Sequence, residues 1–191
     1  MTRPETLPVG LLGLLDAVEA CEREATLLVA DLSDEEVNWQ QTPGQSWSVA
    51  QCLEHLTLMN EFYLRGFAPL VDQARQKGIG PFNGLSSSAI GRWFVRSQEP
   101  PVKRRFKAPG QVVPGSNLRR DGLVDRFVWS HNLYRAIVQT AGDVDISRVK
   151  GPNPFFNAVK MRVSTVLQII PAHDRRHLWQ AANVKRSLRS R

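Results

Sequence analysis

Helical periodicity constrains this chain more than any other feature of its sequence. Four long stretches carry apolar residues at three- and four-residue steps, which place those residues on one face of an α-helix. We expect these helices over residues 11–31, 48–76 and 117–141, and from about residue 164 toward the C-terminal end. We expect no paired strands and find no internal repeat. The pattern therefore predicts an all-α protein, a four-helix bundle with long connections.

Turn and capping residues mark where these helices begin and end. Ser48, followed three residues later by Gln51, has the spacing of a capping box at the start of the second helix. Residues 86–98 are expected to form one extra short helix within the excursion at 78–117. An excursion of that length is uncommon in a compact domain, so we expect it to have a functional role. Pro171 should disturb one backbone hydrogen bond of the fourth helix.

Length and composition fit one globular domain. The chain has 191 residues, and a 42% hydrophobic content is sufficient for a real core. We therefore expect a single domain over 1–191, with a bundle core at about 8–185 and a basic tail at about 185–191. The first thirty residues lack the pattern of a secretory signal, and no apolar run is long enough to span a membrane. We accordingly expect a soluble, cytoplasmic protein that has no membrane partner.

The net charge of +7 raises the question of nucleic-acid binding. Two short runs supply the excess of positive charge: Lys103, Arg104, Arg105 and Lys107, then Lys185, Arg186, Arg189 and Arg191. The chain has 25 basic and 18 acidic residues, so it is close to neutral without those eight cations. We do not expect specific nucleic-acid recognition. Polyanion binding through the two runs, sensitive to salt and independent of metal, is kept as a third hypothesis.

Two of the four histidines form a pair in the fourth helix. His173 and His177 are four residues apart, which places both imidazoles on one helix face, about 6 Å apart. If this face continues the inward stripe of Ile170 and Gln180, two neutral imidazoles would be costly to bury, and a shared cation would remove that cost. A pair of solvated surface histidines is the alternative. Because no H-E-x-x-H motif supplies a general base, the zinc-peptidase interpretation fails.

A third ligand for such a cation would have to come from another helix. His55 lies early in the second helix and borders its apolar stripe, so it is the best candidate. The alternative for His55 is a half-buried, hydrogen-bonded core histidine. His131 lies beside the line through Phe127 and Tyr134 on the third helix and is the weaker ligand candidate.

Two segments resemble one known family. Trp47-Ser48-Val49-Ala50-Gln51-Cys52-Leu53-Glu54-His55-Leu56 and His173-Asp174-Arg175-Arg176-His177-Leu178-Trp179-Gln180 are similar to the DinB-like (YfiT-like) four-helix-bundle proteins. The resemblance implies that His55, His173 and His177 bind one divalent metal ion, commonly nickel, zinc or iron. It also implies a homodimer. Members of that family include transferases and isomerases that use low-molecular-weight thiols, as well as many bundles with no known reaction.

The preferred hypothesis is a metal-dependent enzyme. Three neutral imidazoles leave a divalent ion at least one open position, where it would lower the pKa of a thiol or a water that attacks a small electrophilic substrate. Thiol S-transfer is the first version and hydrolysis the second. Asp174 and Gln180 are candidates for groups that support the ligands, with solvent exposure as the alternative for Asp174.

A non-catalytic module is the second hypothesis. It would bind a metal or another ligand and would form a dimer through exposed aromatic residues such as Trp93 and Phe94. A metal site closed to solvent would favour it. Cys21 and Cys52 do not form a Cys-x-x-Cys pair, and we expect both to be buried free thiols and not nucleophiles.

Overall fold

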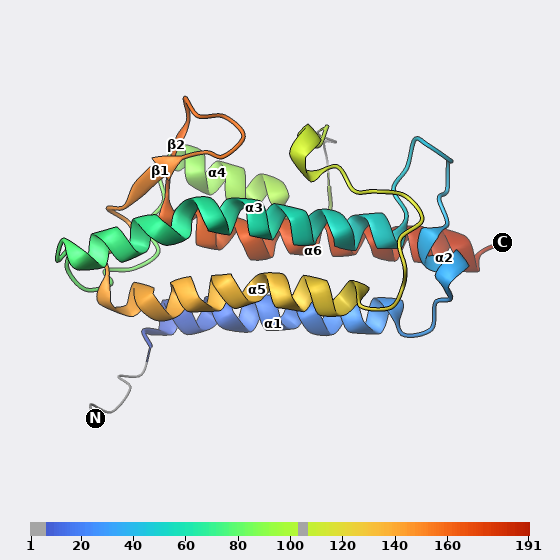
Figure 1. The fold of residues 1–191 in the computed structure, drawn as a ribbon, viewed down its shortest axis with the longest axis horizontal. Helices are drawn as coiled ribbons and strands as arrows, with labels where there is room; N and C mark the ends of the chain where they lie inside the picture. The colour runs from blue at the N-terminus through green and yellow to red at the C-terminus, as the bar shows by residue number, and fades with distance from the viewer. Residues whose placement is uncertain (1–6, 103–106) are drawn as a thin grey trace.

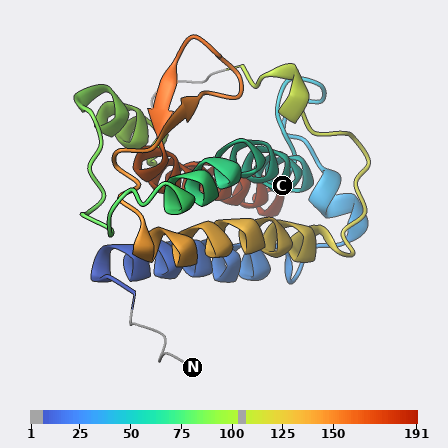
Figure 2. The ribbon, with the colours of Figure 1, turned by 60° about the vertical axis from the view of Figure 1, so that its left-hand side comes forward.

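Four long helices form the body of the protein. The computed structural model describes residues 7–102 and 107–191. The long helices are α1 (Val9–Val29), α3 (Val49–Gln76), α5 (Leu123–Thr140) and α6 (Val163–Arg189). In Figures 1 and 2, α3 and α6 form one layer of the bundle, and α1 and α5 form the other. The predicted all-α four-helix bundle is confirmed.

The helix ends follow the residues that cap them. The Ser48 hydroxyl accepts a hydrogen bond from the backbone N–H of Gln51, and the Gln51 side chain accepts one from the backbone N–H of Ser48. This capping box was expected and starts α3 one residue later than predicted. The third long helix starts later than expected, at Leu123, because Gly122 adopts a positive φ of 74° immediately before it. Pro171 lies within α6, which continues on both sides of it.

Shorter helices occupy the connections. These are α2 (Asp34–Asn38), α4 (Ala89–Gln98) and the 3-10 turns η1 (Gly110–Val112) and η2 (Ala141–Asp143). The extra short helix expected within residues 86–98 is α4. The five-residue helix α2, whose capping box is made by Ser33 and Glu36, was not predicted.

A small hairpin corrects the expectation that no strands pair. β1 (Lys150–Pro152) and β2 (Lys160–Arg162) are antiparallel, with Lys150 opposite Arg162 and Gly151 opposite Met161. Strands of three residues are too short to show an alternating pattern of apolar and polar residues, so the sequence offered no signal. Gly151 allows the hairpin to pack closely on α3, because a Cβ at this position would lie 2.3 Å from Cδ1 of Leu70.

The core consists of two hydrophobic clusters along the bundle. One contains buried residues such as Tyr63, Phe67 and Tyr134, and the other contains Leu53 and Phe127. Each of the four long helices contributes residues to both clusters, and polar side chains lie near the boundary between the two clusters. That polar layer consists of Glu22, Asn60, Ser130, His131 and Asp174, which are joined by hydrogen bonds.

The remaining segments cover one side of the bundle. In Figure 2, α4, the β1–β2 hairpin and the η1 segment lie on the side of the α3–α6 layer that faces away from α1 and α5. Hydrogen bonds tie α4 and its N-terminal connection to α6, for example from Gln168 Nε2 to Ser87 Oγ at 2.9 Å. Together these segments form a cover over α3 and α6.

The C-terminal basic residues belong to a helix and not to a free tail, because α6 continues through Arg189. Lys185 donates to Asp31, Arg189 contacts Glu36 at 2.7 Å, and the Arg191 guanidinium lies 4.1 Å from the centroid of the Trp39 ring. Much of this positive charge therefore has a partner within the protein. Lys103, Arg104 and Arg105 of the other basic run lie outside the described residues.

Among the helices described, none is long and apolar enough to cross a membrane.

Candidate metal centre

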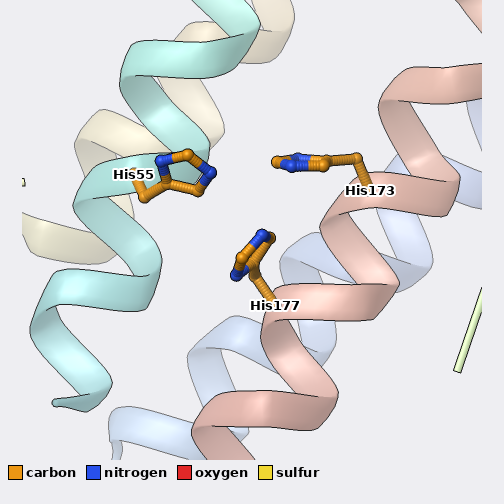
Figure 3. Close-up of side chains that lie close together, drawn as sticks. All are labelled: His55, His173 and His177. Atoms are coloured by element: carbon orange, nitrogen blue, oxygen red, sulfur yellow. The ribbon is translucent and has the colours of Figure 1, made fainter. Parts of the chain in front are cut away.

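Three histidines from two helices converge on one point. His55 projects from α3, and His173 and His177 project from successive turns of α6 (Figure 3). One ring nitrogen from each histidine can be chosen so that all three lie within 4.8 Å of one another. The ring centroids are 4.6 Å apart for His173 and His177, and 4.6 Å apart for His55 and His177. The structure therefore brings together all three residues proposed as ligands.

The excursion before α5 fixes the orientation of His55. Nδ1 of His55 lies 2.7 Å from the backbone carbonyl oxygen of Val112, in η1. Because a carbonyl oxygen only accepts hydrogen bonds, Nδ1 must carry the proton, and the lone pair of Nε2 is left available for a ligand. No residue pattern could have predicted this contact, since any residue at position 112 would present the same carbonyl group.

The polar atoms of the three histidines fit a bound cation. Nδ1 of His177 is buried and makes no hydrogen bond to any described residue. A buried nitrogen without a partner is costly, and coordination would satisfy it. Three imidazoles also form a donor set that suits zinc, nickel or iron. The residues present therefore fit the group that the sequence analysis expected.

Burial keeps the three imidazoles neutral. Burial lowers the pKa of His55, although the hydrogen bond to Val112 opposes it. The pKa of His173 falls well below its usual value through burial and through repulsion that protonated His177, protonated His55 and Arg176 would exert on a second positive charge. Burial, His55 and Arg176 lower the pKa of His177 to about 3, although a hydrogen bond with the Gln180 side chain opposes them. Neutral imidazoles are the form that binds metal, so no proton has to leave first near pH 7.

The histidines face a large cavity and not the bundle interior. They line a cavity of about 1030 Å³, whose other described walls come from α3, α4, α6, the hairpin, the segments at 41–47 and 107–109, and Val102. Among the described residues, none from α1 or α5 lines it. The sequence left two alternatives open for the α6 histidines, and neither describes this placement: they do not point into the bundle interior, and they are not solvated surface residues. Ile169 lines the cavity with them, whereas Ile170 packs in the core.

Asp174 points away from the cavity, into the polar layer of the bundle. Successive residues of a helix are rotated by about 100°, so Asp174 faces a different direction from His173. Its carboxylate is fully buried, with Oδ2 3.0 Å from Nε2 of His131, which excludes the alternative of solvent exposure. Asp174 thus supports His131, and no hydrogen bond joins it to the three ligand candidates among the described residues. Gln180, the other candidate for a supporting group, lines the cavity.

His131 is held between two carboxylates. Its Nε2 faces Asp174, and its Nδ1 lies 2.8 Å from Glu22, which also binds Arg135 at 2.6 Å. Burial alone would lower the pKa of His131, but these bonds and charges outweigh it and raise the pKa to about 9. Burial would raise the pKa of Glu22, and the bonds to His131 and Arg135 lower it. His131 is therefore a charged member of the polar layer and lies outside the histidine cluster.

The structure also shows the environment of the cysteines and of three aromatic residues. Cys21 and Cys52 are buried free thiols, and burial raises the pKa of both, which makes them poor nucleophiles, as expected. Trp93 is 62% exposed, as predicted, but Phe94 is only partly exposed and packs against the core and the cavity. Trp47 belongs to the segment that resembles the family, but no role was predicted for it; its ring lies 4.7 Å from that of His55.

Comparison with known protein families identifies the family of this chain. The family model of the DinB superfamily matches residues 17–181, a range that contains α3, most of α6 and all three histidines. No curated protein and no solved structure matches the chain. Because the family model covers well over half of the sequence, this chain belongs to the DinB superfamily.

Proposed function

We propose that His55, His173 and His177 bind one divalent metal ion, and that the protein is a metal-dependent enzyme acting on a small electrophilic molecule. The observation that carries this proposal is the convergence of three neutral imidazoles on one point in the wall of a large cavity. A divalent ion bound there supplies the chemistry of a Lewis acid, lowering the pKa of a bound thiol or water. Nickel, zinc and iron are the candidate metals.

The chain's own residues would prepare this centre. The carbonyl of Val112 orients His55 and selects its tautomer. The Trp47 ring lies against both His55 and His177, at 4.7 and 5.7 Å between centroids, and limits the access of water on that side. Arg176 is 6% exposed and lines the cavity beside His177, where its charge favours an anionic ligand such as a thiolate.

The open cavity favours an enzyme over a closed module. A structural metal site is enclosed by its ligands, whereas these histidines line about 1030 Å³ of space. That space is enough for a thiol and an electrophile together, which supports S-transfer ahead of hydrolysis. The alternative, a non-catalytic bundle that dimerises through Trp93, would need neither the cavity nor an open metal position.

Thiol consumption in the presence of electrophiles tests the proposed reaction. Protein loaded separately with nickel, zinc or iron would be assayed with low-molecular-weight thiols and 1-chloro-2,4-dinitrobenzene, and with activated esters for hydrolysis. We expect turnover that is lost after chelation, restored by metal and absent in His55→Ala. Metal-loaded protein that turns over neither class of substrate would contradict the enzyme proposal and favour the non-catalytic module.

A further inference from the structure

The cavity extends well beyond the three histidines. Its α6 wall is one continuous stripe of residues, which runs from Thr165 through Ile169 and His173 to Gln180. Fifteen residues of α-helix rise about 22 Å, so the cavity is an elongated trough along this helix. A metal ion with one bound water would fill only a small part of it. The remaining space is large enough for a longer ligand.

The stretch of the trough between the histidines and the hairpin is apolar. Its walls include Met59, Tyr63, Phe94, Phe155 and Ile169. Phe155 packs edge-on against Tyr63 with 5.4 Å between the ring centroids, so this wall is a built aromatic surface. Such a surface gains free energy by burying hydrocarbon or aromatic groups and gains nothing from charged ones.

The hairpin brings positive charge to the trough. Lys150, Lys160 and Arg162 all line it. In the antiparallel register Lys150 lies opposite Arg162, and Lys160 is two residues before Arg162, so the three lie on one face of the hairpin. Met161, on the other face, also lines the trough, and the Arg162 guanidinium donates to the carbonyl oxygen of Ser147. Like charges placed directly opposite each other destabilise a hairpin. Among the described residues, no aspartate or glutamate lines the trough to offset this charge.

We propose that the trough binds an elongated substrate with a terminal carboxylate. The carboxylate lies at Lys150, Lys160 and Arg162, the apolar body lies along the aromatic wall, and the reacting group lies at the histidines. From Arg162 to His173 the chain rises about 16 Å along α6, which sets the distance between the two ends of the substrate. Only the contact of the reacting group rests on the function proposed above. The charge and length preferences depend on the hairpin and the wall.

Calorimetric titration with chain-length and charge analogues tests this inference. The probes are 11-mercaptoundecanoate, the short acid 3-mercaptopropanoate and the neutral 11-mercaptoundecan-1-ol, kept below micelle-forming concentrations. We expect the long acid to bind at least about ten-fold more tightly than either analogue. Equal affinity for the long acid and the long alcohol, or for the long and the short acid, would overturn the proposal.

Matched variants locate the carboxylate. The double variant Lys150→Gln/Lys160→Gln should weaken binding of the long acid by about ten-fold and leave the neutral alcohol unchanged. The control Lys77→Gln/Arg119→Gln removes the same charge from exposed positions outside the trough and should change neither affinity. An equal loss in both double variants would show a general charge effect and contradict a hairpin site.

Metal-free protein separates this inference from the proposed metal centre. If the histidines bind no metal, the preference for the long acid over the alcohol should persist in chelated protein and in His177→Ala. If the metal centre is right and the trough proposal is wrong, metal-loaded protein should bind all three thiols without regard to length or charge. The two proposals thus fail with different results.

Discussion

His131 is the residue whose role the sequence conceals most. The sequence placed it on the third helix beside an apolar line, which is correct, but nothing in the sequence shows that Glu22 and Asp174 meet it there. Those partners are 109 and 43 residues away along the chain, and only the packing of four helices brings them together. The charge of His131 is a property of that packing.

This charge makes stability depend on pH in a defined direction. The pKa of His131 rises from 6.5 to about 9 on folding, so its contribution is fully present below pH 6.5 and is lost as pH rises through 9. We expect the difference in unfolding free energy between wild type and His131→Gln to shrink by about 3 kcal/mol from pH 6 to pH 10. Denaturant titrations with chelator would measure it, and a difference independent of pH would contradict a charged His131.

The metal affinity of the three clustered histidines should change little with pH near neutrality. Their pKa values are lowered, so protons compete with metal only in acid. Competition titrations against a chromogenic chelator should show less than about a three-fold loss of affinity from pH 8 to pH 6. Three ordinary histidines with a pKa of 6.5 would lose on the order of 60-fold over the same range, and that result would contradict neutral, buried ligands.

At the scale of elements, the features predicted from the sequence are the helices and the helix cap that depend on local signals. Helical periodicity and the Ser48 capping box located α3 within one residue, and the spacing of His173 and His177 placed both on one face. The direction of that face could not be predicted, because both sides of α6 are covered: α1 packs on one, and α4 and the hairpin on the other. Short elements such as β1 and β2 depend on tertiary contacts and leave no periodic pattern.

Removing the cap of α3 should destabilise the protein measurably. Ser48 is buried, and its hydroxyl accepts the backbone N–H of Gln51 two turns before His55. Ser48→Ala should lower the unfolding free energy by about 1 kcal/mol. Ser33→Ala removes the same kind of cap from the five-residue α2 and should cost less, because α2 packs against fewer elements. Chemical denaturation compares the two variants, and an equal or larger loss in Ser33→Ala would contradict this ranking.

At the scale of the whole molecule, the bundle keeps the buried ion-pair layer and the histidine cluster apart. The bundle interior holds the layer of Glu22, His131 and Asp174, which is closed by its own hydrogen bonds and ion pairs. The opposite face of α6 holds the histidine cluster, under a cover made from the long connections. The excursion at 78–117 contributes Val112 to the orientation of His55 and α4 to the cavity wall. His173 therefore belongs to the histidine cluster, whereas its neighbour Asp174 belongs to the polar layer of the bundle.

Metal content of the purified protein tests the central claim most directly. Elemental mass spectrometry would be applied to untagged wild type, His55→Ala and His177→Ala, with His131→Gln as the histidine control outside the cluster and circular dichroism to verify folding. We predict about one equivalent of nickel, zinc or iron in wild type and His131→Gln, and a loss of metal in both cluster variants. A folded wild type that contains no metal and binds none when it is added would contradict the account.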